Sequence, residues 1–236
     1  MRKIQKLFRE KKGTTMVEML VTLLLITIMM AMAASSLSSA SRIFVRVQKT
    51  QYAQSILDTV MTELRTITQN AGSYVKIYEN GKNITDTTGN SSGNAIEFIN
   101  EEGYVVLVST DGCLATNLYI GEDQVGTASA VEEGQLLTRY YTRASSTQTY
   151  PYQKENAPAA RAVATVYGKG FYMGNYLRIE YSFPDGTAAG DKTEYIIANV
   201  ALYSDAAYQN MVAQDSEILE FRHPVTCSTA VTAVAE

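Results

Sequence analysis

The chain has 236 residues, a formal net charge of −4, two cysteines, one histidine and no tryptophan. This length allows one membrane segment and one domain, or two small domains. The acidic balance argues against a general nucleic-acid-binding surface, which needs a basic face. A single histidine, His223, excludes a two-histidine metal or catalytic centre, and two cysteines are too few for a disulfide scaffold.

Basic residues precede a long apolar run at the amino-terminal end. Residues 1–12 contain six cationic side chains and one acidic side chain, and the run Met16–Ala34 is almost entirely apolar. At about 1.5 Å per residue this run would extend roughly 28 Å as a helix, close to the roughly 30 Å hydrocarbon thickness of a bilayer. The pattern predicts a single membrane-spanning helix with its basic end in the cytoplasm and the carboxyl-terminal domain outside.

Glu18 is the one ionisable residue in the apolar run, where an acidic side chain at a helix centre costs roughly 2.5 to 3.5 kcal/mol, and less near the end. One interpretation is a helix cap, because Thr15 and Glu18 have the spacing of a capping box. A second interpretation starts from Gly13, the only glycine before Gly72, where a protease could bind extended backbone. Cleavage after Gly13 would place the cationic amine of Thr14 within reach of Glu18.

The segment Lys11–Leu20, KKGTTMVEML, resembles the class III signal of type IV pilins and type II secretion pseudopilins. In that family a membrane-embedded aspartyl peptidase, the prepilin peptidase, cleaves after the glycine and methylates the new amino-terminal residue. The glutamate at the fifth mature position then pairs with the amine of an adjacent subunit. The resemblance implies processing between Gly13 and Thr14, methylation of Thr14, and an assembly role for Glu18.

The resemblance covers roughly the first forty residues and includes two departures from the family pattern. Thr14 stands where the family usually has phenylalanine or methionine, and the run Ala31–Ser41 replaces a proline common in pilin helices. An ordinary secretory signal is the competing interpretation, with Met19–Met30 as its apolar core and a small-residue cleavage site at Ala31–Ala33. Glu18 would interrupt that core, and the helical pattern continues beyond the cleavage site.

Helical periodicity continues from Arg42 to Asn70, with apolar residues mostly three or four positions apart and no proline before Pro151. We therefore expect one helix that Gly72 ends as a left-handed cap. The predicted organisation is a basic leader at 1–13, a long helix at 14–70 with its transmembrane half at 16–34, and a globular β-rich domain at 71–236.

Beyond Gly72 the pattern alternates, which predicts strands. Asn80-Gly81 predicts a hairpin turn, Asn83–Asn94 an exposed loop, and Ala206–Ala213 a short helical turn. The predicted strands are Tyr74–Glu79, Ala95–Ile99, Tyr104–Ser109, Leu114–Ile120, Leu136–Thr142, Arg161–Tyr167, Tyr176–Phe183, Tyr195–Tyr203 and Ile218–Phe221. The second and third should turn at Asn100–Gly103, and a polar stretch without a strand should follow Ile120. The strict alternation in Tyr176–Phe183 predicts that Leu177, Ile179, Tyr181 and Phe183 face a core, with Arg178 and Glu180 facing water. The predicted fold class is α+β: a long amino-terminal helix, membrane-spanning in its first half, packed on an antiparallel β-sheet, as in pilins.

Few residues in the predicted domain have the type and spacing of a catalytic, metal-binding or cofactor-binding site. Cys113 and Cys227 both lie in the part expected outside, where one disulfide could form, and two buried free thiols are the alternative. The glycines of Gly168–Gly174 lack dinucleotide-binding spacing, and Asp185–Glu194 lacks the EF-hand pattern. We expect no catalytic residue, no metal and no cofactor, and therefore no enzyme.

The expected function is that of a structural assembly subunit: a minor pilin or pseudopilin in a type IV pilus-like filament for adhesion, secretion or DNA uptake. Its expected partners are the prepilin peptidase, other pilin or pseudopilin subunits, an inner-membrane assembly platform and membrane lipid. It would reside in the cell membrane and reach the cell surface after assembly. The alternative is a membrane-anchored or secreted binding domain that never polymerises. Sixteen tyrosines fit an adhesive face, although strand propensity explains them equally well.

Overall fold

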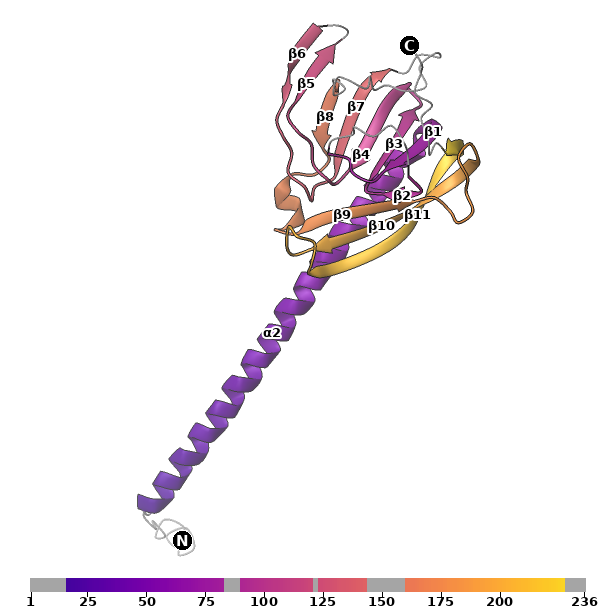
Figure 1. Ribbon diagram of the computed structural model, residues 1–236. Helices are drawn as coiled ribbons and strands as arrows, with labels where there is room; N and C mark the ends of the chain where they lie inside the picture. The colour runs from indigo at the N-terminus through magenta and orange to yellow at the C-terminus, as the bar shows by residue number, and fades with distance from the viewer. Residues whose placement is uncertain (1–15, 83–89, 121–122, 144–159, 228–236) are drawn as a thin grey trace, which may run out of the picture. The chain divides into compact units, whose positions relative to one another are not determined.

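The computed structural model describes residues 16–82, 90–120, 123–143 and 160–227 (Figure 1). The chain divides into two units, Met1–Lys49 and Thr50–Glu236, and the boundary between them lies inside the long helix α2. Helix α2 spans Met16–Gln69. The strands are β1 Ala71–Tyr78, β2 Ser92–Gly93, β3 Ala95–Asn100, β4 Tyr104–Ser109, β5 Thr116–Ile120, β6 Asp123–Ala128, β7 Leu137–Arg143, β8 Ala162–Thr165, β9 Tyr176–Ser182, β10 Lys192–Tyr203 and β11 Met211–Cys227, with a short 3₁₀ helix, η1, at Lys169–Tyr172.

Helix α2 contains neither glycine nor proline, the two residues that most destabilise a helix interior. It remains helical through the small-residue run that begins at Ala31. The helix ends at Gln69, where the Asn70 N–H donates to the Ile67 carbonyl. The prediction that Gly72 caps the helix is wrong. Gly72 already lies inside β1, because the chain enters the sheet at Ala71 after a single turn residue.

Nine strands form one sheet in the order β2-β9-β10-β11-β1-β3-β4-β7-β8, and β5 pairs with β6 in a separate two-stranded sheet. All neighbours in the large sheet are antiparallel except β1 and β11, which run parallel through Tyr74 opposite Thr226 and Val75 opposite Cys227. This parallel pair joins the strand that follows α2 to the last strand. The α+β fold class, a long amino-terminal helix with a mostly antiparallel sheet, is confirmed.

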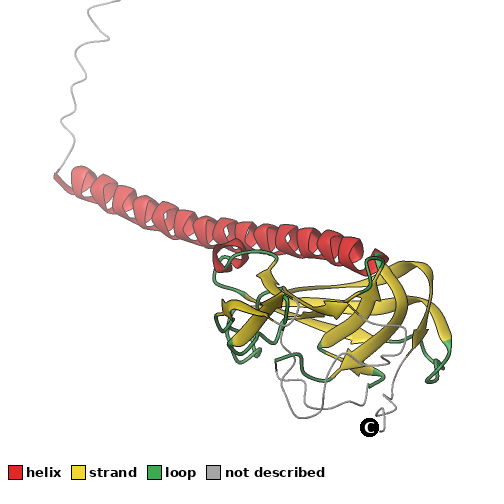
Figure 2. Ribbon diagram, turned by 90° about the horizontal axis from the view of Figure 1, so that it is seen from above, coloured by secondary structure: helices red, strands yellow, loops and turns green. Residues whose placement is uncertain are grey.

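The carboxyl-terminal part of α2 packs on one face of this sheet (Figure 2). Leu57, Val60 and Leu64 are at most 2% exposed. Removing each such side chain from water stabilises the fold by about 1.5–3 kcal/mol. The helix residues buried in this interface are Ala53, Ile56, Leu57, Val60, Met61, Leu64 and Thr68. Their spacing of three and four gives the single apolar stripe expected of a helix on a sheet.

A second, smaller cluster lies on the other face of β1 and β3 and includes Tyr78, Val105 and Leu107. Two charged residues, Lys76 and Glu97, are fully buried there, opposite each other on the two strands. The Tyr74 and Tyr78 hydroxyls donate to the two carboxylate oxygens of Glu97 at 2.6 and 3.0 Å. These hydrogen bonds stabilise the buried carboxylate, because a buried charge without partners is strongly destabilising.

The structure corrects the expected hairpin at Asn80-Gly81. Strand β1 pairs with β11 and with β3, which begins only at Ala95, well beyond the reach of a two-residue turn. Instead, the Gly81 N–H donates to the Asp111 carboxylate at 2.7 Å, and its carbonyl accepts a hydrogen bond from Arg139. A Cβ on Gly81 would lie 2.4 Å from the Ser109 Cβ. Gly81 is therefore required because the backbone of this turn packs directly against Ser109.

Three further local predictions need correction. The polar stretch after Ile120 contains β6, which pairs with β5. Ala206–Ala213 is not helical, because β11 begins at Met211. The expected loop Asn83–Asn94 contains β2, which pairs with β9; residues 83–89 lie outside the described residues.

Candidate functional site

The processing site expected from the sequence lies outside the described residues, since both Gly13 and Thr14 precede Met16. Thr15, the capping-box partner, also lies outside them. Glu18 is described, and it stands in the first turn of α2. A carboxylate at this position is stabilised by the positive end of the helix dipole, typically by about 0.3–1 kcal/mol at an exposed site.

Apolar side chains surround Glu18 and continue along the first part of α2. The consecutive residues Leu23 to Ile26 are each at least half exposed, and at 100° per residue four of them point to nearly all sides of the helix. A helix that is apolar on every side requires a non-aqueous environment. Among the described residues, α2 is the one helix long and apolar enough to cross a membrane.

The few hydroxyl groups in this segment are satisfied within the helix. Thr22, Thr27 and Ser35 donate to the carbonyls of the residues three positions earlier at 2.9, 2.8 and 2.8 Å. Such internal bonds remove the need for water at these positions, which the hydrocarbon core of a bilayer does not provide. The apolar part of α2 is therefore compatible with a single-pass membrane anchor in its hydrogen bonding as well as in its length.

The two cysteines are free, buried thiols, the alternative to the possible disulfide between them. Cys113 lies in a bridge with Val131, and its Sγ donates to the Leu114 carbonyl at 3.0 Å. Cys227 ends β11, where its N–H donates to the Asp191 carbonyl at 2.8 Å. Burial raises the pKa of the Cys227 thiol to about 11, so this thiol is protonated and unreactive at neutral pH.

Titratable groups in the described part of the chain serve structure more clearly than catalysis. Burial raises the pKa of Asp111, and the hydrogen bond from Gly81 partly offsets this effect. Its carboxylate accepts a hydrogen bond from the Gly81 N–H, and Arg139 donates to the carbonyl of the same residue. His223 is exposed on β11. No three His, Cys, Asp or Glu side chains among the described residues come together in a group that could hold a metal ion.

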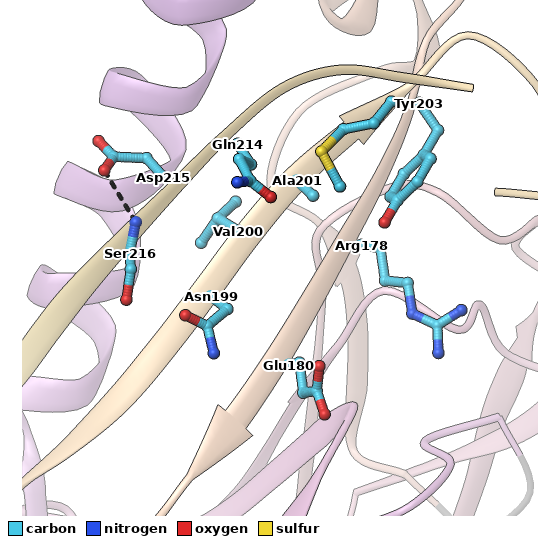
Figure 3. A pocket seen from close by; sticks show the side chains of 10 residues that line it. Arg178, Glu180, Asn199, Val200, Ala201, Tyr203, Gln214, Asp215 and Ser216 are labelled. Atoms are coloured by element: carbon cyan, nitrogen blue, oxygen red, sulfur yellow. Dashed lines mark hydrogen bonds between the residues drawn. The ribbon is translucent and has the colours of Figure 1, made fainter. Parts of the chain in front are cut away.

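Sequence reasoning missed two polar arrangements in the domain. One is the group of Lys76, Glu97 and two tyrosines. Lys76 and Glu97 are buried because both faces of β1 and β3 are covered, which depends on the order of the strands in the sheet. The other is a polar hollow on β9, β10 and β11 (Figure 3). The strict alternation in β9 does place Arg178 and Glu180 on its exposed face, as predicted.

The fold and this helix define an α+β protein with one long apolar amino-terminal helix packed on a β-sheet, an architecture compatible with a pilin-like fold. Comparisons with family models, with curated proteins and with solved structures found no match for this chain.

Proposed function

We propose that this protein is a structural assembly subunit of a type IV pilus-like filament, either a minor pilin or a pseudopilin. The observation that carries the proposal is the position of Glu18, in the first turn of an apolar helix that continues unbroken to Gln69. A carboxylate in lipid is costly. A filament subunit would gain from it by pairing it with the new amine of a neighbouring Thr14.

The second half of α2 supports the same proposal. From Ala53 to Thr68 the helix contributes seven residues to the core of the domain. The helix that would insert into a filament is thus part of the domain that the filament would display. The globular part, residues 71–236, is large for a bare filament subunit, which favours a minor or tip-proximal place. No catalysis by this chain is part of the proposal.

The first test is intact mass and amino-terminal sequencing of the protein from its native membrane. We expect a chain that starts at Thr14 and carries an added methyl group of about 14 Da. A chain that starts near Ala34 or Ser41 would indicate ordinary secretion. An uncleaved chain beginning at Met1 would indicate a plain anchor. Either result would contradict class III processing.

The second test separates assembly from anchoring. Glu18→Ala should abolish incorporation into sheared filaments while the protein remains in the membrane fraction. Asp58→Ala is the matched control, because Asp58 is an exposed carboxylate on the same helix outside the apolar segment. The alternative, a surface binding domain that does not polymerise, predicts a different result. Glu18→Ala would then insert into the membrane as well as or better than the original chain, and neither Glu18→Ala nor Asp58→Ala would be found in filaments.

A further inference from the structure

A polar hollow of about 510 Å³ lies on β9, β10 and β11 (Figure 3). The registers of these strands align Arg178 with Ala201 and Gln214 in one row. The neighbouring row aligns Glu180 with Asn199 and Ser216. Leu177 and Ile179 of β9 point into the core, so Arg178 and Glu180 point to the opposite face.

The hollow has a simple steric origin. Ala201 has a short side chain, and the long side chains of Arg178 and Gln214 stand beside it on the two neighbouring strands. Asn199 and Tyr203 are two residues away along β10 and therefore share its face. A small residue surrounded by larger ones leaves a depression in an otherwise flat sheet, and its volume falls within the range of about 300–1,000 Å³ typical of small-molecule sites.

The polar groups that line the hollow are available to a ligand. Within the described part of the chain, no hydrogen bond occupies the side chains of Glu180, Asn199 or Gln214. Figure 3 shows them without links to one another; its one dashed line is the bond from the Ser216 N–H to the Asp215 carboxylate, 2.8 Å long. One carboxylate and two amides offer both donors and acceptors close together.

One wall of the hollow is fixed in place before any ligand binds. The Arg178 guanidinium lies 5.3 Å from the centre of the Tyr208 ring, and this ring meets the Tyr203 ring edge-on at 5.3 Å. Tyr208 has a φ of +55°, in the left-handed region. The Asp205 carboxylate holds this loop by accepting backbone hydrogen bonds from three residues, Ala207, Gln209 and Asn210. These bonds also lower the pKa of Asp205.

The charges around the hollow select the class of ligand. Among the residues that line it, Arg178 is the only cation and Glu180 is the carboxylate on the same face; Asp215 pairs with the buried Val200, so its carboxylate points to the opposite face. Without an excess of positive charge the site is unsuited to phosphate or another anion. The described residues hold no group suited to a metal ion. Two amides, a carboxylate and a guanidinium on neighbouring strands fit the adjacent hydroxyl groups of a neutral sugar, which both donate and accept hydrogen bonds.

We propose that this hollow binds a neutral saccharide unit, with Asn199, Gln214 and Glu180 contacting its hydroxyl groups and Tyr203 and Arg178 forming the wall. The site is independent of the proposed filament function, because it uses only β9, β10, β11 and the loop between the last two. A preorganised wall reduces the ordering cost of binding. The open, polar lining predicts weak affinity, in the millimolar range, for a single sugar unit.

The test uses the full chain in lipid nanodiscs, because sugar-based detergents would compete for the site. Saturation-transfer NMR would be titrated with the methyl glycosides of glucose, galactose, mannose and N-acetylglucosamine, and binding of inorganic phosphate would be measured in parallel. We expect saturable binding of at least one glycoside and none of phosphate. Asn199→Ala and Gln214→Ala should each weaken glycoside binding about fivefold, the effect of losing one neutral hydrogen bond.

Two further variants make the outcome decisive. Gln124→Ala removes an exposed strand glutamine outside the hollow and should leave binding unchanged. Ala201→Leu fills the hollow and should abolish binding without lowering the melting temperature of the domain. The proposal is overturned if no glycoside binds saturably, if Asn199→Ala and Gln214→Ala leave the affinity unchanged, or if phosphate binds and these variants weaken it.

Discussion

Leu64 offers the sharpest test of the inference that the second half of α2 is part of the domain core. Its side chain is 0% exposed, in the interface between the helix and the sheet. Leu64→Ala deletes three buried carbon atoms and leaves a cavity, because the neighbouring strands can close it only in part. Substitutions of this kind cost about 2.7–5 kcal/mol. For a domain of this size, each kcal/mol lowers the melting temperature by about 2–4 °C.

We therefore expect Leu64→Ala to lower the melting temperature by roughly 10 °C. The assay is thermal unfolding of the full chain in nanodiscs, followed by near-ultraviolet circular dichroism of its tyrosines, since the chain has no tryptophan. Leu20→Ala is the matched control, because Leu20 on the same helix is 69% exposed. A loss below about 1 kcal/mol for Leu64→Ala, or an equal loss for both variants, would refute the reasoning.

Two further predictions concern backbone approach and alkaline stability. Gly93→Ala should destabilise the domain by about 1–3 kcal/mol in chemical denaturation, because the new Cβ would lie 2.1 Å from the Tyr78 carbonyl oxygen, whereas Gly126→Ala meets nothing within 4 Å and should be neutral. Burial raises the pKa of Tyr172 to about 12 from the usual 10.0. Its contribution to the free energy of unfolding is complete below pH 10 and is lost as the pH rises towards 12. Tyr172→Phe should remove this loss of stability between pH 10 and 12. It should also lower the free energy of unfolding by about 1–3 kcal/mol at neutral pH, since the Leu136 N–H loses its acceptor. If the stability of Tyr172→Phe falls with pH as it does in the original chain, Tyr172 is not the group that titrates.

Local patterns in the sequence were sufficient for much of the fold. Helical periodicity without a proline predicted a helix that ends near Asn70, and α2 ends at Gln69. The alternation in Tyr176–Phe183 predicted which residues of β9 are buried. The turn between β3 and β4 was predicted at Asn100–Gly103, where Gly103 adopts a φ of +84°. In each case the deciding interactions lie within a few residues of each other, so the pattern contains them.

Predictions failed where distant segments decide the structure. Gly81 does not form the expected two-residue hairpin turn, because Asp111, just after β4, and Arg139 of β7 bind its backbone. Strand β6 is polar and mostly exposed, since it pairs only with β5 outside the large sheet, and a strand without a buried face has no alternating pattern. The parallel pairing of β1 with β11 joins residues about 150 positions apart in the sequence, and nothing in either strand encodes its partner.

The same limit applies to the candidate sites. Glu18 could be singled out because a charge within an apolar run is visible in the sequence. The hollow on β9, β10 and β11 could not, since it exists only when the registers place Ala201 between Arg178 and Gln214. Each of these residues is unremarkable by itself. A site made of a row across three strands requires the pairing of those strands before it can be recognised.

The composition of α2 changes along its length, and this change separates the proposed assembly role from the stability of the domain. A helix is only marginally stable in water without tertiary packing. Around Leu64 the sheet supplies that packing. Around Leu20 the apolar side chains are exposed on all sides, so lipid or neighbouring subunits must supply the environment. Substitutions near Glu18 should therefore alter insertion and assembly and leave domain unfolding unchanged, whereas Leu64→Ala should weaken the domain first.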